Sequence, residues 1–204
     1  MYRGKTIVQV GAHVGNTEND PIFKEVDETT RIILVEPVPY LFNKLRENYS
    51  AKFRDTSNIS FVNKAVSNFI GEIELTIPSE RNDFSSLPVY ASQLASVNPT
   101  HATGHIHRLI VDKIRVPTTT VDEIVNEYNL SSIDLLHTDT EGHDYYILMN
   151  YSFSVKPRQV LFEHKHIDGL FTVGRKYIEL CNKLLSLGYT KKHSIGDDTM
   201  FEIC

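Results

Sequence analysis

Cysteine, long apolar runs and an excess of positive charge are all scarce in this chain of 204 residues. Its two cysteines, Cys181 and Cys204, form no CxxC motif, so we expect no disulfide framework and a reducing, cytoplasmic environment. No apolar run has the length that crosses a bilayer, and no secretory leader is recognisable, so no membrane partner is expected. The formal net charge of -5 argues against a broad nucleic-acid-binding surface.

What the sequence does contain is the composition of an ordinary globular protein. Hydrophobic residues make up 41% of the chain and charged residues 23%, which excludes a disordered or fibrous class. A chain of this length can bury one sheet that is covered on both faces. We therefore expect a single domain over residues 1–204.

The order of apolar segments predicts an α/β fold. Runs of strand length occur at 6–10, 31–36, 59–62, 133–137 and 159–163. Helical spacing occurs at 40–49, 120–128 and 177–187, the second with Thr120 as N-cap and the third closed by Gly188. Alternating strands and helices predict a mostly parallel, twisted sheet, and residues 188–203 read as a terminal antiparallel hairpin that turns through Gly196 and Asp197.

Residues 78–112 interrupt this pattern. Two further strand-like runs, 72–77 and 113–116, bracket a stretch that is rich in Ser, Pro, Asn and His and has no strong periodicity. An irregular insertion of this length is typical of a lid or a substrate-binding loop. We expect the insertion to shape the pocket of the substrate through its larger side chains, which are Phe84, Tyr90, Leu94, His101, His105 and His107.

The three histidines of the insertion raise the question of a metal. Histidines with this spacing can bind zinc, but no cysteine or carboxylate accompanies them at the spacing of a metal site. Contact with a substrate, or plain exposure to solvent, is the expectation for them. No metal site is predicted from the sequence.

A glycine turn after the first strand is the first motif that carries chemistry. Gly11-Ala-His-Val-Gly15 has GxxxG spacing, unlike the GxGxxG turn that seats a pyrophosphate, and residues 16–20 separate it from a helical start at Ile22-Phe23. Such a turn suits a ligand without phosphates. Glu36 ends the second strand and could accept two hydrogen bonds from a ribose diol, although a solvated carboxylate at a strand end is the alternative.

Two later strands also end in ionisable residues. Asp139 and Glu141 follow the strand at 133–137 and would reach the same crevice, as a base, a metal ligand or a cofactor contact. In the alternative, Asp139 and Thr140 only cap the next helix.

The next strand ends in Glu163-His-Lys-His166, any of which could act as a base or ligand. Extended geometry would place Glu163 with Lys165 on one side and His164 with His166 on the other. A strand-end salt bridge with surface histidines is the alternative for these residues.

Taken together, these motifs resemble the FkbM-type family of S-adenosylmethionine-dependent methyltransferases. The most specific matching blocks are Val35-Glu-Pro37 and Asp139-Thr-Glu-Gly142. Looser matches, in the order of the family, are found at 8–15, 20–21, 62–67, 116–122, 162–167, 188–189 and 198–199. The resemblance spans nearly the whole chain and implies a Rossmann-like class I methyltransferase fold, with S-adenosylmethionine as the cofactor.

The resemblance also implies roles for individual residues. Gly11, Ala12, His13 and Gly15 would line the methionine part of the cofactor, Glu36 would hold the ribose, and Asn63, Lys64 and Ala65 would border the adenine, with Asn16 and Pro37 completing the cofactor-binding set. Asp139, Glu141 and Glu163 would face the reacting centre. Gln9 and His13 depart from the residues that are common in the wider superfamily, which leaves the contact to the cofactor's ammonium group open.

The implied activity is methyl transfer to a hydroxyl oxygen of a sugar or a small natural product. A hydroxyl is a poor nucleophile and needs a base, and Asp139 or Glu163 could be that base. Two alternatives stay open. One is a nucleotide- or sugar-binding domain that has lost turnover, which Gln9 and a start close to the first strand would fit. The other is a nicotinamide-dependent oxidoreductase, which the GxxxG spacing and the terminal hairpin disfavour.

Overall fold

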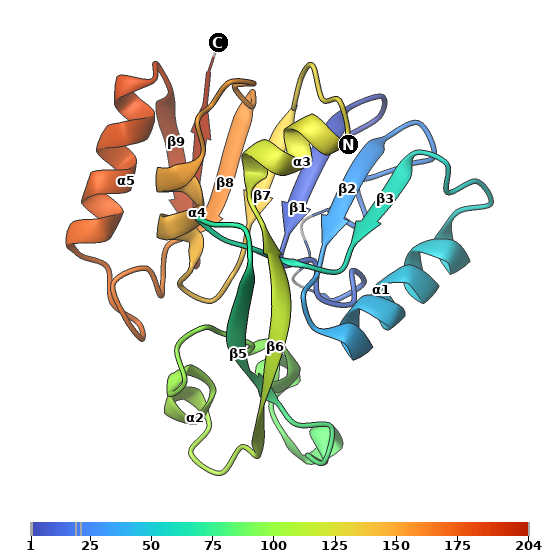
Figure 1. Cartoon of the computed structure of the whole chain (residues 1–204), viewed down its shortest axis with the longest axis vertical. Helices are drawn as coiled ribbons and strands as arrows, with labels where there is room; N and C mark the ends of the chain where they lie inside the picture. Colours follow the sequence, from blue (N-terminus) through green and yellow to red (C-terminus); the bar gives the residue numbers. More distant parts are fainter. Residues whose placement is uncertain (1, 19, 21, 204) are drawn as a thin grey trace.

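The computed structural model describes residues 2–18, 20 and 22–203. Pro21 and Cys204, which entered the sequence interpretation, lie outside the described residues. Seven strands form the main sheet in the order β3-β2-β1-β7-β8-β10-β9 (Figure 1). Their bounds are Thr6–Val10 (β1), Arg31–Val35 (β2), Ile59–Val62 (β3), Leu135–Thr138 (β7), Gln159–Glu163 (β8), Thr190–Ile195 (β9) and Asp198–Glu202 (β10).

The first five of these strands are parallel, and the sheet ends in an antiparallel hairpin. β1 pairs with β2 and β7, β2 with β3 and β7 with β8, all in parallel. β10 runs antiparallel to both β8 and β9. Gly196, at φ +59, lies in the turn between β9 and β10. The predicted parallel sheet with a terminal antiparallel hairpin is therefore confirmed.

Helices cover both faces of the sheet because successive strand residues alternate in direction. On one face Val8, Ile33 and Leu136 pack against the helices α3, α4 and α5. On the other face Ile7 and Leu34 pack against α1 and the segment that follows the glycine turn. The helix bounds are Pro39–Lys52 (α1), Val121–Glu127 (α3), Asp144–Asn150 (α4) and Arg175–Ser186 (α5).

The helix ends agree with the signals in the sequence. The Thr120 hydroxyl accepts the Glu123 backbone N–H at 3.1 Å and so caps the N-terminus of α3. Gly188, at φ +93, follows the C-terminal residues of α5 in a conformation that glycine adopts without strain.

The helical start that we predicted at Ile22-Phe23 is wrong. Ile22 and Phe23 lie in turns rather than in a helix, and the Asp20 carboxylate accepts both of their backbone N–H groups.

The insertion is carried by a second, smaller sheet. β5 (Glu72–Pro78) pairs antiparallel with β6 (Val111–Thr119), and β4 (Ala65–Val66) pairs in parallel with β6. The β5–β6 ribbon projects from the main sheet and bears the short helix α2 (His101–His105) near its far end (Figure 1). Both strands that the sequence predicts around the insertion are therefore present.

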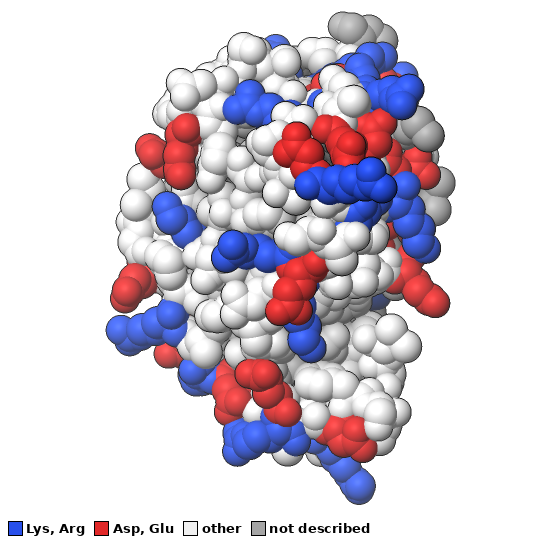
Figure 2. Space-filling view, turned by 90° about the vertical axis from the view of Figure 1, so that its right-hand side faces the viewer, with Lys and Arg blue, Asp and Glu red and all other residues white. Residues whose placement is uncertain are grey.

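Residues 79–110 are ordered around a small apolar cluster of their own. Ala91, Leu94, Ala102 and Leu109 are buried there, with two 3-10 turns at Phe84–Ser86 and Val89–Gln93. On the face shown in Figure 2, basic and acidic side chains are interspersed. In the described part of the chain, no helix is long and apolar enough to cross a membrane.

Candidate functional site

The site begins at the glycine turn between β1 and the loop that follows it. The backbone N–H groups of Gly11 and Ala12 both donate to the Val35 carbonyl at 3.0 Å, which fastens this turn to the end of β2. Gly11 has φ +79, and a Cβ there would lie 1.8 Å from the Asp139 carbonyl oxygen. Only glycine permits the turn to pass this close to the loop after β7.

Glu36 lies directly beside this turn and is only 4% exposed. One of its carboxylate oxygens accepts the His13 N–H and the other accepts the Val38 N–H, both at 2.9 Å. Burial raises the pKa of Glu36 to about 7, although these two hydrogen bonds favour the ionised form. The alternative of a solvated strand-end carboxylate is therefore wrong. Since each carboxylate oxygen has two lone pairs, Glu36 retains capacity to accept from a ligand.

A pocket with an empty volume of about 1020 Å³ opens at the carboxyl ends of β1, β2 and β7. Its walls come from the main sheet and the loops after β1, β2 and β7, from α1, from the β4–β5 region and from the insertion. A crevice at this edge of an open α/β sheet is where such folds bind ligands. The cavity therefore lies where the strand order predicts a binding site.

Gln9 and Asp20 form a polar pair in this pocket that the sequence interpretation did not assign to the site. The Gln9 amide N–H donates to the Asp20 carboxylate at 2.9 Å, which leaves the buried Gln9 Oε1 without a hydrogen-bond partner among the described residues. Burial raises the pKa of Asp20, while the N–H groups of Ile22, Phe23 and Gln9 oppose the shift. Gln9 and Asp20 both line the cavity, and their amide and carboxylate groups are suited to a ligand amine.

The loop after β7 brings Asp139 and Glu141 to the pocket wall beside β1. The Asp139 N–H donates to the Val10 carbonyl at 3.0 Å, so the loop continues the β1–β7 ladder into the pocket. The alternative in which Asp139 and Thr140 cap the next helix is wrong. His143 occupies the N-cap position of α4 without a side-chain cap, and Thr140 instead donates to Asp144.

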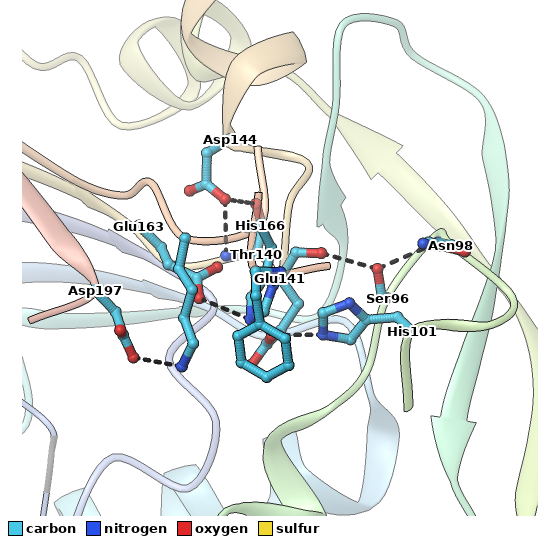
Figure 3. Close-up of polar contacts among 11 residues, drawn as sticks. Ser96, Asn98, His101, Thr140, Glu141, Asp144, Glu163, His166 and Asp197 are labelled. Atoms are coloured by element: carbon cyan, nitrogen blue, oxygen red, sulfur yellow. Dashed lines mark hydrogen bonds and ion pairs between the residues drawn. The ribbon is translucent and has the colours of Figure 1, made fainter. Parts of the chain in front are cut away.

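Three carboxylates meet at this point. Asp139, Glu141 and Glu163 each offer an oxygen, and these oxygens lie within 4.8 Å of one another. Figure 3 shows two of these residues, Glu141 and Glu163. Asp139 lines the pocket and is exposed there. Desolvation by the surrounding protein atoms, and then the Glu141 charge, raise the pKa of Asp139 above its usual range.

The pKa of Glu163 is also raised well above its usual range, first by burial and then by the neighbouring Asp139. Glu163 is only 5% exposed. The expected sorting of residues 163–166 by alternation is wrong, because β8 ends at Glu163 and the chain then turns. His166 Nε2 lies 3.7 Å from the Glu163 carboxylate, whereas Lys165 pairs with Asp197.

Three polar contacts hold the insertion against the pocket. His101 Nε2 lies 2.6 Å from the Glu141 carboxylate, and the Ser96 hydroxyl donates to the Glu141 carbonyl at 2.9 Å (Figure 3). His13 Nε2 lies 3.2 Å from the Ser92 carbonyl. The insertion therefore contacts both the glycine turn and the loop after β7.

Nine of the thirteen residues that we predicted for the site line the pocket. They are Gly11, Ala12, His13, Glu36, Pro37, Lys64, Ala65, Asp139 and Glu141. The other four lie nearby in supporting positions. Gly15 packs against the side chains of Leu45 and Tyr49, Asn16 accepts from Asn48, Asn63 donates to the carbonyls of Glu36 and Pro37, and Glu163 lies next to Asp139.

The insertion lines the pocket with other residues than we expected. Its contributions are Gln93, Ala95, Ser96 and Val97. Leu94 is buried in the insertion's own apolar cluster, and Tyr90 is 43% exposed. His137 and His143 also line the pocket, and burial lowers the pKa of each to about 4. No local motif marks these residues, because strands far apart in the sequence bring them together.

The strand order, the terminal hairpin and the pocket at the strand ends define a Rossmann-like class I methyltransferase fold. A sequence model described as the methyltransferase FkbM domain matches residues 9–190. The chain belongs to the FkbM methyltransferase family. The resemblance noted from the motifs is thereby confirmed. No curated protein matches the sequence.

Solved structures show the same fold at low sequence identity. The FkbM methyltransferase from Methylobacillus flagellatus superposes with a TM-score of 0.57 at 13% identity, over 99% of this chain and 44% of that one. A Staphylococcus aureus protein assigned as a caffeoyl-CoA O-methyltransferase gives a TM-score of 0.51 at 11% identity, over 98% of this chain and 75% of that one. The chain thus spans less than half of the Methylobacillus protein.

Proposed function

We propose that this chain is an S-adenosylmethionine-dependent O-methyltransferase that acts on a hydroxyl group of a sugar or a small natural product. The observation that carries the proposal is the position of the raised-pKa carboxylate Asp139. It lines one pocket together with the glycine turn and Glu36. Family membership makes S-adenosylmethionine the cofactor. The proposal of a hydroxyl acceptor rests on Asp139, because a hydroxyl nucleophile requires a base to take its proton.

The pocket residues fit this cofactor in three respects. The orphaned Gln9 Oε1 and the Asp20 carboxylate supply acceptors for an ammonium group. The turn at Gly11 and Ala12 lines the cavity, and the glycine lets a ligand's amino-acid chain approach it closely. Glu36 faces the same cavity with free lone pairs for a ribose diol. When bound, the cofactor would supply a methyl group on a sulfonium for transfer to an acceptor oxygen, with S-adenosylhomocysteine as the leaving group.

The chain's own contribution is alignment, exclusion of water and removal of a proton. A base works best when its pKa lies near the working pH, and desolvation by the surrounding protein, together with the neighbouring carboxylates, raises the pKa of Asp139 in that direction. Asp139 lines the pocket and Glu163 does not, which favours Asp139 Oδ as the atom that takes the hydroxyl proton. Glu163 lies within 4.8 Å of it and can share that proton.

Thermal unfolding with added ligands tests the proposal. S-adenosylmethionine and S-adenosylhomocysteine should each raise the midpoint, because a ligand that binds only the folded state stabilises it, and NAD should leave it unchanged. Glu36→Ala should lose most of the shift. A shift with NAD alone would overturn the proposal in favour of an oxidoreductase.

Turnover separates the proposal from a domain that binds the cofactor without catalysis. Methyl transfer from labelled cofactor to a panel of glycosides and polyhydroxylated natural products is the direct measurement. Transfer that Asp139→Asn abolishes supports the O-methyltransferase. Tight cofactor binding without transfer to any hydroxyl acceptor would instead indicate a binding domain that has lost turnover.

A further inference from the structure

The structure gathers histidines that the proposed methyl transfer does not use. His101 and His105 lie one turn apart on α2, and His166 follows β8. Their ring centroids are separated by 4.7 to 4.9 Å. Glu141, from the loop after β7, points into this group (Figure 3). Three elements that are far apart in the sequence therefore converge on one small volume.

The donor atoms of this cluster have the spacing of a metal site. One ligand atom from each of His101, His105, Glu141 and His166 lies within 4.8 Å of all the others. Zinc bonds of about 2.1 Å in tetrahedral geometry place donors roughly 3.4 Å apart. The 2.6 Å between His101 Nε2 and Glu141 Oε2 would open slightly to admit an ion. Small side-chain rotations are therefore sufficient.

His105 has a ring nitrogen that no hydrogen bond in the structure explains. Its Nε2 is buried and has no partner among the described residues. The ring of His105 lies beside that of His101, with 4.7 Å between the ring centroids, and imidazole nitrogens are common zinc ligands. A buried nitrogen lone pair beside a second histidine and a carboxylate is otherwise costly.

His166 has a different part in the cluster. Its Nδ1 accepts the Phe171 backbone N–H at 3.1 Å, so the proton of the neutral ring is on Nε2. That N–H faces Glu141 and Glu163, with 3.7 Å to each carboxylate. His166 thus orients the carboxylate ligand, in the way that outer partners orient ligands in metal sites.

We propose that His101, His105 and Glu141 bind a divalent transition metal, best matched by zinc, at the junction of the insertion and the pocket. Two histidines at positions i and i+4 of a helix with a glutamate from elsewhere are a zinc donor set, and they leave a fourth position for water. Because Glu141 lines the pocket, the ion would fasten α2 to the pocket wall.

Cobalt titration of the chelator-treated, full-length protein tests this proposal without any methyl acceptor. The wild-type chain should bind one Co²⁺ per molecule with visible d–d absorption, and Zn²⁺ should displace it. His105→Ala should weaken binding at least about 100-fold, since even outer partners of a metal site are worth 10–100-fold. The absence of Co²⁺ and Zn²⁺ binding by the wild type would overturn the proposal.

His107→Ala is the matched control, because His107 is exposed in the same histidine-rich stretch and lies outside the cluster. It should bind Co²⁺ as the wild type does. If His105→Ala does not fold, Glu141→Gln provides the second variant, with circular dichroism of each metal-free protein as the check. Binding that survives both ligand substitutions, or that His107→Ala removes, would contradict the assignment. A negative result in the metal titration would not change the result expected from the cofactor-binding experiments, because those experiments do not involve α2.

Discussion

The two sides of the pocket are built on different principles. On the sheet side, backbone groups and glycines make the site, as the Gly11 turn lies against the Asp139 carbonyl and Glu36 binds two backbone N–H groups. On the insertion side, side chains make it, through His101 and Ser96. On the sheet side, the contact between Gly11 and the Asp139 carbonyl tolerates almost no substitution. On the insertion side, the contacting side chains can be exchanged, and with them the ligand that the pocket binds.

Gly11→Ala should produce the largest effect, because its Cβ would fall 1.8 Å from a backbone oxygen that cannot move without breaking the β1–β7 ladder. We expect a loss of more than about 4 kcal/mol in the free energy of unfolding. Gly4→Ala is the control, since Gly4 has a similar φ of +62 but no atom within 4 Å of an added Cβ. It should cost about 1–2 kcal/mol. Equal losses in denaturant titrations would contradict this account.

Asp139→Asn should come next, with turnover reduced about 10²–10⁴-fold and a much smaller change in cofactor affinity. The amide keeps the shape of the side chain but cannot accept the hydroxyl proton. Asp197→Asn serves as the control, because Asp197 is an exposed carboxylate that pairs with Lys165. Comparing kcat with the dissociation constant of S-adenosylhomocysteine separates the two effects. Full turnover in both Asp139→Asn and Glu163→Gln would show that neither residue is the base.

Glu36 should make the stability of the free protein depend on pH. Its pKa is raised to about 7 by burial, so between pH 4.5 and 7 the folded chain keeps a proton that the unfolded chain releases. The Glu36 contribution to stability is therefore largest below pH 4.5 and is lost as pH rises through 7, by on the order of 3 kcal/mol.

Denaturant titrations of wild type and Glu36→Gln across this range measure the Glu36 contribution as a difference. The difference cancels the histidines, whose lowered pKa values act in the opposite sense. Glu47→Gln, a change at an exposed position on α1, should show the wild-type profile. Parallel profiles for wild type and Glu36→Gln would mean that Glu36 is ionised throughout.

The smallest effect is expected at the β5–β6 ribbon. Lys113 and Glu74 form an ion pair at 2.7 Å, but both side chains are about half exposed or more. Lys113→Ala should change the free energy of unfolding by less than about 1 kcal/mol, because water screens such pairs. A loss above about 2 kcal/mol would show that this pair, rather than the backbone ladder, fixes the ribbon.

The sequence predicted the sheet side well because its signals are local. The apolar runs of the strands, the Thr120 cap and the Gly188 C-terminus each depend on neighbours within a few residues. The same holds for Gly11 and Glu36, which end strands that pair in parallel. The segment at Ile22 failed because the Asp20 carboxylate satisfies its N–H groups in turns instead of a helix.

The insertion side could not be predicted because its contacts depend on tertiary structure. Glu141 and His101 are 40 positions apart in the sequence and meet only after β5 and β6 have paired. Alternation along an extended chain separated His166 from Glu163, yet the turn after β8 brings them together. Asp20 was visible only as part of a family block, and its pairing with Gln9 became evident from the fold.

A crystal structure of the chain in complex with S-adenosylhomocysteine would show where each part of the cofactor binds. We expect the amino-acid portion along Gly11 and Ala12, with its ammonium group at Gln9 and Asp20. We expect the ribose hydroxyls at Glu36 and the sulfur directed toward Asp139. A ligand bound elsewhere, or one whose ribose lies away from Glu36, would contradict this expectation.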